Sequence, residues 1–514
     1  MAAPSSSRPV PRTPVGSRSA WQSARVVAIF VLPYLVLALF WVFANPAMAA
    51  PDEPDHLVKA VGMARLDIGV PAPPAPEGSK LGTVRNASIS RVVEIPARLD
   101  PTGYACFYFT PEVTAACQPA PSSAEGDRAV TTTLGAYPPF LYPPLGWVAS
   151  LGASVTQATI LARLLVLAAS TLLLWLACDH LVRWLGPRAL VGPALLLTPM
   201  GIFCMGILNT SAVEILGALG MAGVVVVYAR HPDSLTERRT LVVVLVSGTA
   251  LVLSRQLGLV TMALLTMLLL ALGAWRPILD QLRRRCPVMV AAVAVPVAAT
   301  LAVAGWELVF DHPVLLGPWA SRESLDGFQV IFWQLIHEGV GWFGWLDVRP
   351  PDLVNDVWFA AVVLVVALAC LVGDHRDRTV IVGVLLVALA VIYVTYSRVF
   401  FPVNGGIQGR HVLPILSVVP VWAGVVLVER LPRTWLVRGV RVAAALLPLV
   451  VAAGLYLNSQ RYAVGLDPAV GLRWFVPDAQ WSPPGGWYLW LAVGLSGCVG
   501  LGVTWVRTLA RTDR

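Results

Sequence analysis

The segment PDEPDH at positions 51–56 gathers the residue types that could do acid–base chemistry, namely Asp52, Glu53, Asp55 and His56. A carboxylate can accept the proton of an attacking hydroxyl as a general base. Asp52, Asp55 and His56 could alternatively bind a divalent cation, because oxygen ligands and one imidazole suit several such ions. The same residues also suit a helix start, with Asp52 as N-cap and acids facing the helix dipole. The spacing alone leaves all three interpretations open.

Three further motifs carry residues that suit an amphiphilic phosphorylated substrate. They are GAYPPFLYPPLGW with Tyr137 and Tyr142, GWFGWLD with Trp345 and Asp347, and IQGRH with Gln408, Arg410 and His411. Aromatic rings pack against apolar surfaces such as sugar faces and isoprenoid chains, and a guanidinium binds phosphate through two parallel hydrogen bonds. The structural alternative is an interfacial belt of aromatic residues and a snorkelling arginine.

The elements that position these residues are membrane spans. Of the 514 residues, 57% are hydrophobic and 13% are charged, whereas soluble proteins average about 25% charged residues. A span needs about 20 apolar residues. About twelve runs fit, those between 240 and 274 least clearly: 26–44, 158–178, 189–207, 212–229, 240–254, 257–274, 287–309, 357–373, 379–397, 411–428, 440–457 and 487–506. We therefore expect an all-α polytopic membrane protein.

Arginine placement predicts the orientation of these spans, because short cytoplasmic loops retain positive charge. With a cytoplasmic N-terminus, every inside connection contains at least two arginines: DHLVRWLGPR, RHPDSLTERR, WRPILDQLRRRC, DHRDR, ERLPRTWLVRGVR and the tail RTLARTDR. Both termini are then cytoplasmic in a multi-pass cell-membrane protein. The net charge of +8 follows from this topology, so we expect no nucleic-acid partner. A cleaved signal peptide ending at ANPAMAAP is the less favoured interpretation of the first run.

Three connections predicted to be exterior are unusually long, at 45–157, 310–356 and 458–486. Long loops on a rigid bundle tend to carry binding and catalysis, so the active face is expected outside. Cys106 and Cys117 are the two cysteines in the first of these loops and are predicted to form a disulfide, which the exterior permits. We expect the chain to divide into a disordered cytoplasmic tail at 1–25, a transmembrane domain at 26–506 and a second cytoplasmic tail at 507–514.

Four polar residues lie within or beside the apolar runs, at Arg163, Asn209, Glu214 and Arg255. Charge in lipid is costly unless it faces a partner or an aqueous cavity. An internal pair of Glu214 with Arg255 or with Arg163 is therefore expected to hold the bundle together.

The motifs P-D-E-P-x-H at 51–56, Y-P-P twice within 137–144, G-W-L-D at 344–347 and Q-G-R at 408–410 together resemble the bacterial membrane family of domain of unknown function 2142, over about residues 26–430. That family is similar to the GT-C class of membrane glycosyltransferases, such as protein mannosyltransferases, which use polyprenyl-phosphate sugars. The usual aromatic residue after Q-G-R is replaced here by His411. The resemblance implies a GT-C-like fold with a large exterior loop after the first span.

It further implies inverting transfer of a sugar from a polyprenyl phosphate to an exterior glycan, glycolipid or protein acceptor of the cell envelope. Asp52 is the expected base and Glu53 its catalytic partner. Expected substrate-binding residues are His56, Tyr137, Tyr142, Trp345, Asp347, Gln408, Arg410 and His411. These residues do not require a cofactor. If one is used, the residues suggest a divalent cation. The alternatives are a transporter or flippase of lipid-linked sugars, an envelope polysaccharide polymerase or ligase, and a non-catalytic assembly factor.

Overall fold

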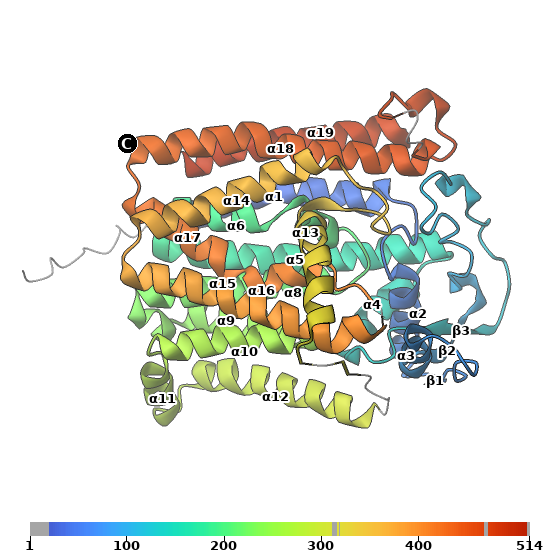
Figure 1. The fold of residues 1–514 in the computed structure, drawn as a ribbon, viewed down its shortest axis with the longest axis horizontal. Coiled ribbons are helices and arrows are strands. Elements are labelled where there is room, and N and C mark those ends of the chain that lie inside the picture. Colours follow the sequence, from blue (N-terminus) through green and yellow to red (C-terminus); the bar gives the residue numbers. More distant parts are fainter. Residues whose placement is uncertain (1–19, 311–315, 318, 404, 467–470, 511–514) are drawn as a thin grey trace, which may run out of the picture.

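The computed structural model describes residues 20–310, 316–317, 319–403, 405–466 and 471–510. Its long helices run side by side in one bundle (Figure 1). Eight helices are long and apolar enough to span a membrane. They are α1 (Ala20–Ala44), α5 (Val155–Leu185), α8 (Ser211–Arg230), α12 (Pro287–Val309), α14 (Asp352–Val372), α15 (His375–Thr395), α18 (Arg433–Val464) and α19 (Gly486–Leu509). The expected polytopic helical architecture is confirmed.

The count of twelve straight spans is not confirmed. Three further crossings are bent helix pairs, which bring the number to eleven among the described residues. The pairs are α6 (Val191–Leu196) with α7 (Pro199–Met205), α10 (Gln256–Ala271) with α11 (Trp275–Arg283), and α16 (Gly409–Leu416) with α17 (Val418–Arg430). The first bends by 86°, because Thr198 caps a new helix at Gly201 and Pro199 lacks an N–H for the old one. Helix α9 (Arg238–Ser254) has 17 residues, about 26 Å of helix, which is short for a span.

Both ends of the described chain lie at the same end of the bundle. Helices α1 and α19 are antiparallel: Tyr34 Oη accepts a hydrogen bond from Trp505 Nε1 at 3.1 Å, and Phe40 packs beside Gly494. The start of α1 and the end of α19 therefore lie at the end of the bundle opposite to α2 (Glu53–Ala64) (Figure 1). We call the end that carries α2 the loop-bearing end. The tails predicted at 1–25 and 507–514 fall largely outside the described residues, and Ala20 to Arg25 are already helical.

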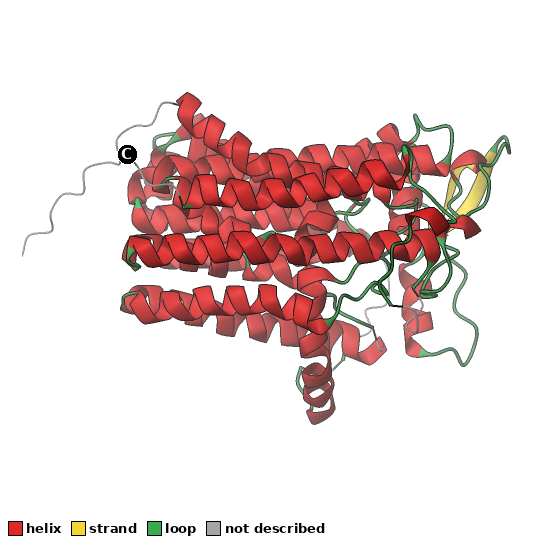
Figure 2. Ribbon diagram, turned by 90° about the horizontal axis from the view of Figure 1, so that it is seen from above, coloured by secondary structure: helices red, strands yellow, loops and turns green. Residues whose placement is uncertain are grey.

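The first long connection, 45–157, is structured. It contains α2, α3 (Leu81–Ile89), α4 (Tyr142–Ala149) and an antiparallel sheet of β1 (Val70–Pro71), β2 (Arg91–Pro96) and β3 (Asp127–Thr132), with β2 in the middle. The register runs from Arg91 opposite Thr132 to Pro96 opposite Asp127. The sheet lies at the loop-bearing end (Figure 2). This small sheet qualifies the all-α prediction, and the predicted Cys106–Cys117 disulfide is present.

The second long connection contains a helix that the hydropathy pattern did not predict, α13 (Arg322–Gly341). It is amphipathic and lies across the direction of the other helices (Figure 1). Phe328 and Leu335 are buried on one side, while Val330 and Trp333 are exposed on another. Ser321 caps its start through a reciprocal pair of bonds with Ser324. The last turn of α13 carries Glu338, which lies at the candidate active site.

Candidate active site

Helix α2 is fixed by two charged residues, Lys59, which is buried, and Asp55, which is partly buried. Lys59 Nζ donates to the carbonyls of Leu134, Gly135 and Tyr137 at 2.7, 3.0 and 2.6 Å. Asp55 Oδ1 accepts the N–H of Thr133 at 2.5 Å. Burial raises the pKa of Asp55 to about 6 and lowers that of Lys59 to about 7. These bonds join α2 to the segment that carries the two Y-P-P motifs.

His56 faces the second of these motifs. Its Nδ1 lies 3.0 Å from Tyr142 Oη, and the two rings stack with centroids 5.8 Å apart. Both side chains are buried. Burial lowers the pKa of His56 well below its usual value, and the nearby Arg255 and Arg410 charges lower it further. A neutral imidazole therefore lies beside Tyr142.

Asp52 pairs with Arg410 across 358 positions of sequence. Asp52 Oδ2 accepts from Arg410 Nη2 at 3.0 Å. The Asp52 side chain is 37% exposed, whereas that of Arg410 is 3% exposed. Asp52 adopts a left-handed backbone with φ of 65° and makes no side-chain cap bond. Asp52 thus occupies the predicted N-cap position of α2, but its carboxylate binds Arg410 and makes no capping bond to the helix.

The glycine of Q-G-R is required by a close approach of α13. Glu338 Oε2 accepts the N–H of Gly409 at 2.8 Å, and a Cβ at position 409 would lie 2.1 Å from the nitrogen of Gly339. At the start of α16, Gln408 N donates to His411 Nδ1 at 3.3 Å, and His411 N donates to the main-chain carbonyl of Gln408 at 2.9 Å. These contacts place Arg410 beside Asp52.

A second guanidinium near Arg410 belongs to Arg255, which lies at the break between α9 and α10. Its Nε lies 3.3 Å from Glu214 Oε2, which confirms the predicted Glu214–Arg255 pair. Its Nη2 donates to Ser211 and Thr210 at 3.0 and 3.3 Å, and it lies over the ring of Tyr137 at 5.5 Å. The ring of Tyr137 lies 6.1 Å from that of His56, and His56 stands one turn after Asp52, the partner of Arg410. The two guanidiniums therefore both lie near the start of α2.

That region contains many buried polar atoms without a hydrogen-bond partner in the described part of the chain. They are Nη1 of Arg255, Nε and Nη1 of Arg410, Oε1 of Glu214, Oε1 of Gln408 and Nε2 of His411. Arg255 Nε and Glu214 Oε2 also make no hydrogen bond, but they face one another as an ion pair at 3.3 Å. Buried polar groups in native proteins normally have partners, and exceptions indicate a function or a missing ligand. We call this set, with Asp52, His56, Tyr137 and Tyr142, the Arg410 cluster. Two guanidiniums with free donors suit a phosphate.

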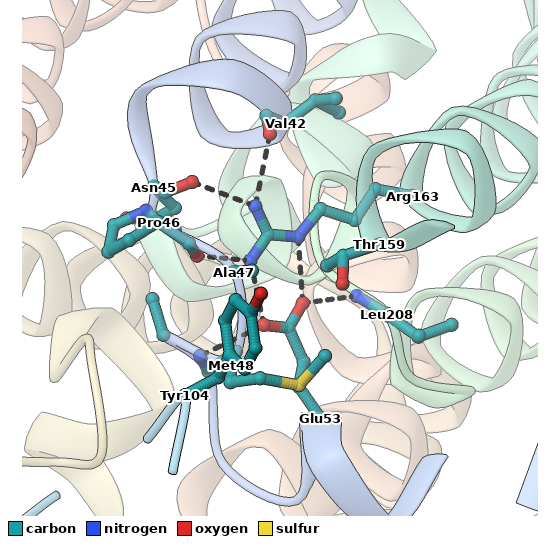
Figure 3. A network of polar contacts seen from close by, with 12 residues as sticks. Val42, Asn45, Pro46, Ala47, Met48, Glu53, Tyr104, Thr159, Arg163 and Leu208 are labelled. Carbon is teal, nitrogen blue, oxygen red and sulfur yellow. Dashed lines mark hydrogen bonds and ion pairs between the residues drawn. The ribbon is translucent and has the colours of Figure 1, made fainter. Parts of the chain in front are cut away.

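Glu53 lies apart from the cluster, in a closed network (Figure 3). Arg163 Nε and Nη2 donate to Glu53 Oε1 and Oε2 at 2.8 and 2.7 Å, and the N–H of Leu208 donates to Oε1 at 2.8 Å. Both charged side chains are 0% exposed. The remaining Arg163 donors bind the carbonyls of Val42, Asn45 and Pro46. Glu53 therefore joins four segments, and the predicted Glu214–Arg163 alternative is wrong.

Trp345 and Asp347 also lie in a separate cluster. Asp347 Oδ2 accepts from Arg461 Nη2 at 2.8 Å, and Arg461 also donates to the carbonyls of Phe107 and Thr110. Trp345 Nε1 donates to Met48 O at 3.0 Å. The carboxylate predicted to bind substrate thus faces an internal arginine that holds the disulfide-closed loop.

The suggested cation site is not formed. Within the ranges that the structure describes, no three His, Cys, Asp or Glu side chains converge as metal ligands. Asp52 faces Arg410, Asp55 faces Thr133 and His56 faces Tyr142. The three side chains leave α2 in different directions.

Two contributors were not assigned to the site from the sequence. Arg255 and Glu214 were interpreted only as a bundle-stabilising pair, although a charge inside an apolar run is also a signal of function. Glu338 carried no signal, because an acid in an amphipathic helix is ordinarily exposed.

Comparisons with known proteins agree with the motif pattern. The family described as "Predicted membrane protein (DUF2142)" matches residues 35–419, and no curated protein matches the chain. Crystal structures of ArnT from Cupriavidus metallidurans are similar at 15% identity. The apo structure gives a TM-score of 0.40 over 93% of this chain and 76% of ArnT. The undecaprenyl phosphate complex gives 0.39 over 96% and 77%. The family match covers most of the sequence, and the chain therefore belongs to the DUF2142 family of predicted membrane proteins.

Proposed function

We propose that this protein is a membrane glycosyltransferase that moves a sugar from a polyprenyl-phosphate donor to a hydroxyl of a cell-envelope acceptor. The observation that carries the proposal is the pairing of half-exposed Asp52 with buried Arg410, beside unpartnered donors of Arg410 and Arg255. A carboxylate next to two guanidiniums suits a reaction that needs a base and releases a phosphate. The reacting face is the loop-bearing end, which we assign to the cell exterior.

Arg410 and Arg255 hold the phosphate of the donor in this proposal. The negative charge on the leaving phosphate grows as the sugar departs, so fixed guanidiniums stabilise the transition state more than the ground state. His411 Nε2 and Gln408 Oε1 are free to contact the same group or the sugar. Tyr137 is partly buried beneath the Arg255 guanidinium, and Tyr142, at the start of α4, is fully buried against His56.

Asp52 acts as the general base. When the donor phosphate takes the Arg410 donors, the Asp52 carboxylate is released from its ion pair and accepts the proton of the acceptor hydroxyl. The hydroxyl oxygen then forms a bond to the anomeric carbon as the bond from that carbon to the phosphate oxygen breaks. The polyprenyl phosphate leaves with the electron pair, and a single displacement inverts the configuration. Glu53 takes no part, because all of its acceptor capacity is directed to Arg163, Leu208 and Ala50.

The decisive experiment compares wild type with Asp52→Asn in membranes supplied with defined polyprenyl-phosphate sugars and candidate acceptors. Asn tolerates the left-handed backbone that Asp52 adopts, so the variant keeps the fold and loses the base. Removing a general base costs about 10² to 10⁴ in rate, and we expect at least the lower loss. Arg410→Lys keeps a positive charge but loses the planar fork of donors. It should slow transfer more at low donor concentration than at saturating donor concentration.

Asp127→Asn is the matched control, because Asp127 is an exposed partner of Arg65 at the same end of the bundle. It should leave transfer unchanged. Near-normal transfer by Asp52→Asn would remove Asp52 as the base. If the wild type consumes no lipid-linked sugar but moves it across the bilayer, the flippase alternative takes the place of the proposal.

A further inference from the structure

A cavity of about 700 Å³ lies at the end of the bundle opposite to the loop-bearing end. Its walls come from the start of α1, the last turns of α5 and the first turns of α9, with Ser23, Arg183 and Arg238 among the lining residues. The Arg410 cluster contributes nothing to it. The cavity therefore needs an explanation that is independent of the proposed glycosyl transfer.

The cavity combines free cationic and free acceptor groups. Arg238 and Arg239 are exposed, and the described residues offer them no hydrogen bond or ion pair. Asp179 Oδ2 accepts from Arg183 at 2.5 Å, while its Oδ1 is buried without a partner. His180 is 3% exposed, and neither of its ring nitrogens has a partner within the described ranges. Leaving such buried atoms unpaired costs free energy. A ligand that forms hydrogen bonds with them removes this cost and therefore binds favourably.

The remaining walls are apolar. Leu176, Val182, Val242 and Val243 line the cavity together with Trp184. The arginines also stand in the first turn of α9, whose backbone N–H groups favour an anion. A ligand that fills the cavity therefore has an apolar part, a negative group near α9 and a donor near Asp179.

We propose that this cavity binds an aminophospholipid, with its phosphate against Arg238 and Arg239 and its primary ammonium against Asp179 and His180. Basic pockets between spans are known to take lipid head groups. A purely anionic head group would meet the carboxylates of Asp179 and Glu237, which also lines the cavity. A choline head group lacks the N–H that Asp179 Oδ1 and an imidazole nitrogen can accept.

The test uses the purified full-length chain in dodecyl maltoside micelles, with its melting midpoint followed as lipid is added. Dioleoylphosphatidylethanolamine is expected to half-saturate the stabilisation at a concentration at least about tenfold lower than the phosphatidylcholine or phosphatidylglycerol with the same acyl chains, since charge-assisted bonds are the strong ones. Soluble O-phosphoethanolamine distinguishes a lipid from a free head group and should stabilise far less. Equal responses to the three lipids, a preference for phosphatidylglycerol, or full stabilisation by O-phosphoethanolamine would overturn the proposal.

Two sets of variants locate the effect. The pair Arg238→Gln and Arg239→Gln should weaken phosphatidylethanolamine binding at least about tenfold, while Arg433→Gln with Arg438→Gln, which removes the same charge from the start of α18, should not. Asp179→Asn should reduce the preference for phosphatidylethanolamine over phosphatidylcholine while phosphate binding persists. Should the Arg238 and Arg239 variant melt lower without lipid, His180→Gln gives the same measurement with the surface charge intact. Unchanged lipid preference in all of these variants contradicts the assignment.

Discussion

At the scale of single residues, the acidic motif divides into different roles. Asp52 turns to Arg410 and stays partly exposed, whereas Glu53, one position later, is fully buried against Arg163. Asp55 is held by Thr133, and His56 by Tyr142. On a helix these successive side chains point in different directions. The three acids and the histidine of one motif therefore reach four different parts of the structure.

Glu53→Gln should destabilise the protein rather than alter its chemistry. Removing one partner of a buried ion pair leaves an uncompensated charge, which typically costs about 3 to 5 kcal/mol. The expected result is a lower melting midpoint in detergent and poor expression. A double variant, Glu53→Leu with Arg163→Leu, should recover part of this loss, because no charge is then left alone. Wild-type stability of Glu53→Gln would contradict the role of this network.

Asp55 should make the stability depend on pH in a predictable direction. Its folded pKa of about 6 lies above the usual value of 3.8, so the folded state binds the proton more tightly. This stabilisation is complete below pH 3.8 and is lost as pH rises through 6, up to about 3 kcal/mol for a shift of about two units. In Asp55→Asn the melting midpoint should decrease less between pH 4 and pH 7 than it does in the wild type.

At the scale of elements, the site depends on helices that cross rather than run parallel. Helix α2 brings Asp52 and His56, α16 begins at Gly409, and α13 lies across the bundle and binds the N–H of Gly409 through Glu338. His411, which stands where the family usually has an aromatic residue, accepts the N–H of Gln408 through Nδ1 at the start of α16. The position of Arg410 is thus set by the contact between α13 and α16.

Gly409→Ala tests this contact. The added Cβ would meet the nitrogen of Gly339 at 2.1 Å, so α16 must shift, and such overpacking typically costs about 1 to 3 kcal/mol. We expect a lower melting midpoint and reduced glycosyl transfer, because Arg410 moves with its helix. Gly406→Ala is the control, since nothing lies within 4 Å of its added Cβ. Equal behaviour of the two variants would argue against this role of the helix contact.

At the scale of the whole molecule, the bundle has two chemically distinct ends. The loop-bearing end carries the Arg410 cluster, the small sheet and the Cys106–Cys117 disulfide. The opposite end carries both ends of the described chain and the cavity with Arg238 and Arg239. Since arginine-rich connections are retained in the cytoplasm, the proposed orientation has the loop-bearing end facing the exterior.

Topology mapping checks this assignment. Reporter tags at both termini should be accessible only after the membrane is permeabilised, while a tag inserted at Ser122, in an exposed part of the first long connection, should react on intact cells. Labelling at Ser122 that requires permeabilisation would reverse the orientation and place the Arg410 cluster in the cytoplasm.

The sequence by itself determined the membrane class, the family motifs, the long structured connections and the disulfide, because hydropathy, short motifs and cysteine placement are local properties. It did not determine which acid faces the site. Asp52 and Arg410 lie 358 positions apart, and only the packing of α2, α13 and α16 brings them together. The same limit applies to the bent pairs, where Thr198 and Pro199 break a run that hydropathy alone predicts as one span. Burial of Glu53 and the convergence of Arg255 with Arg410 are likewise decided by tertiary structure, because charges separated in sequence are paired or left free only when the helices pack.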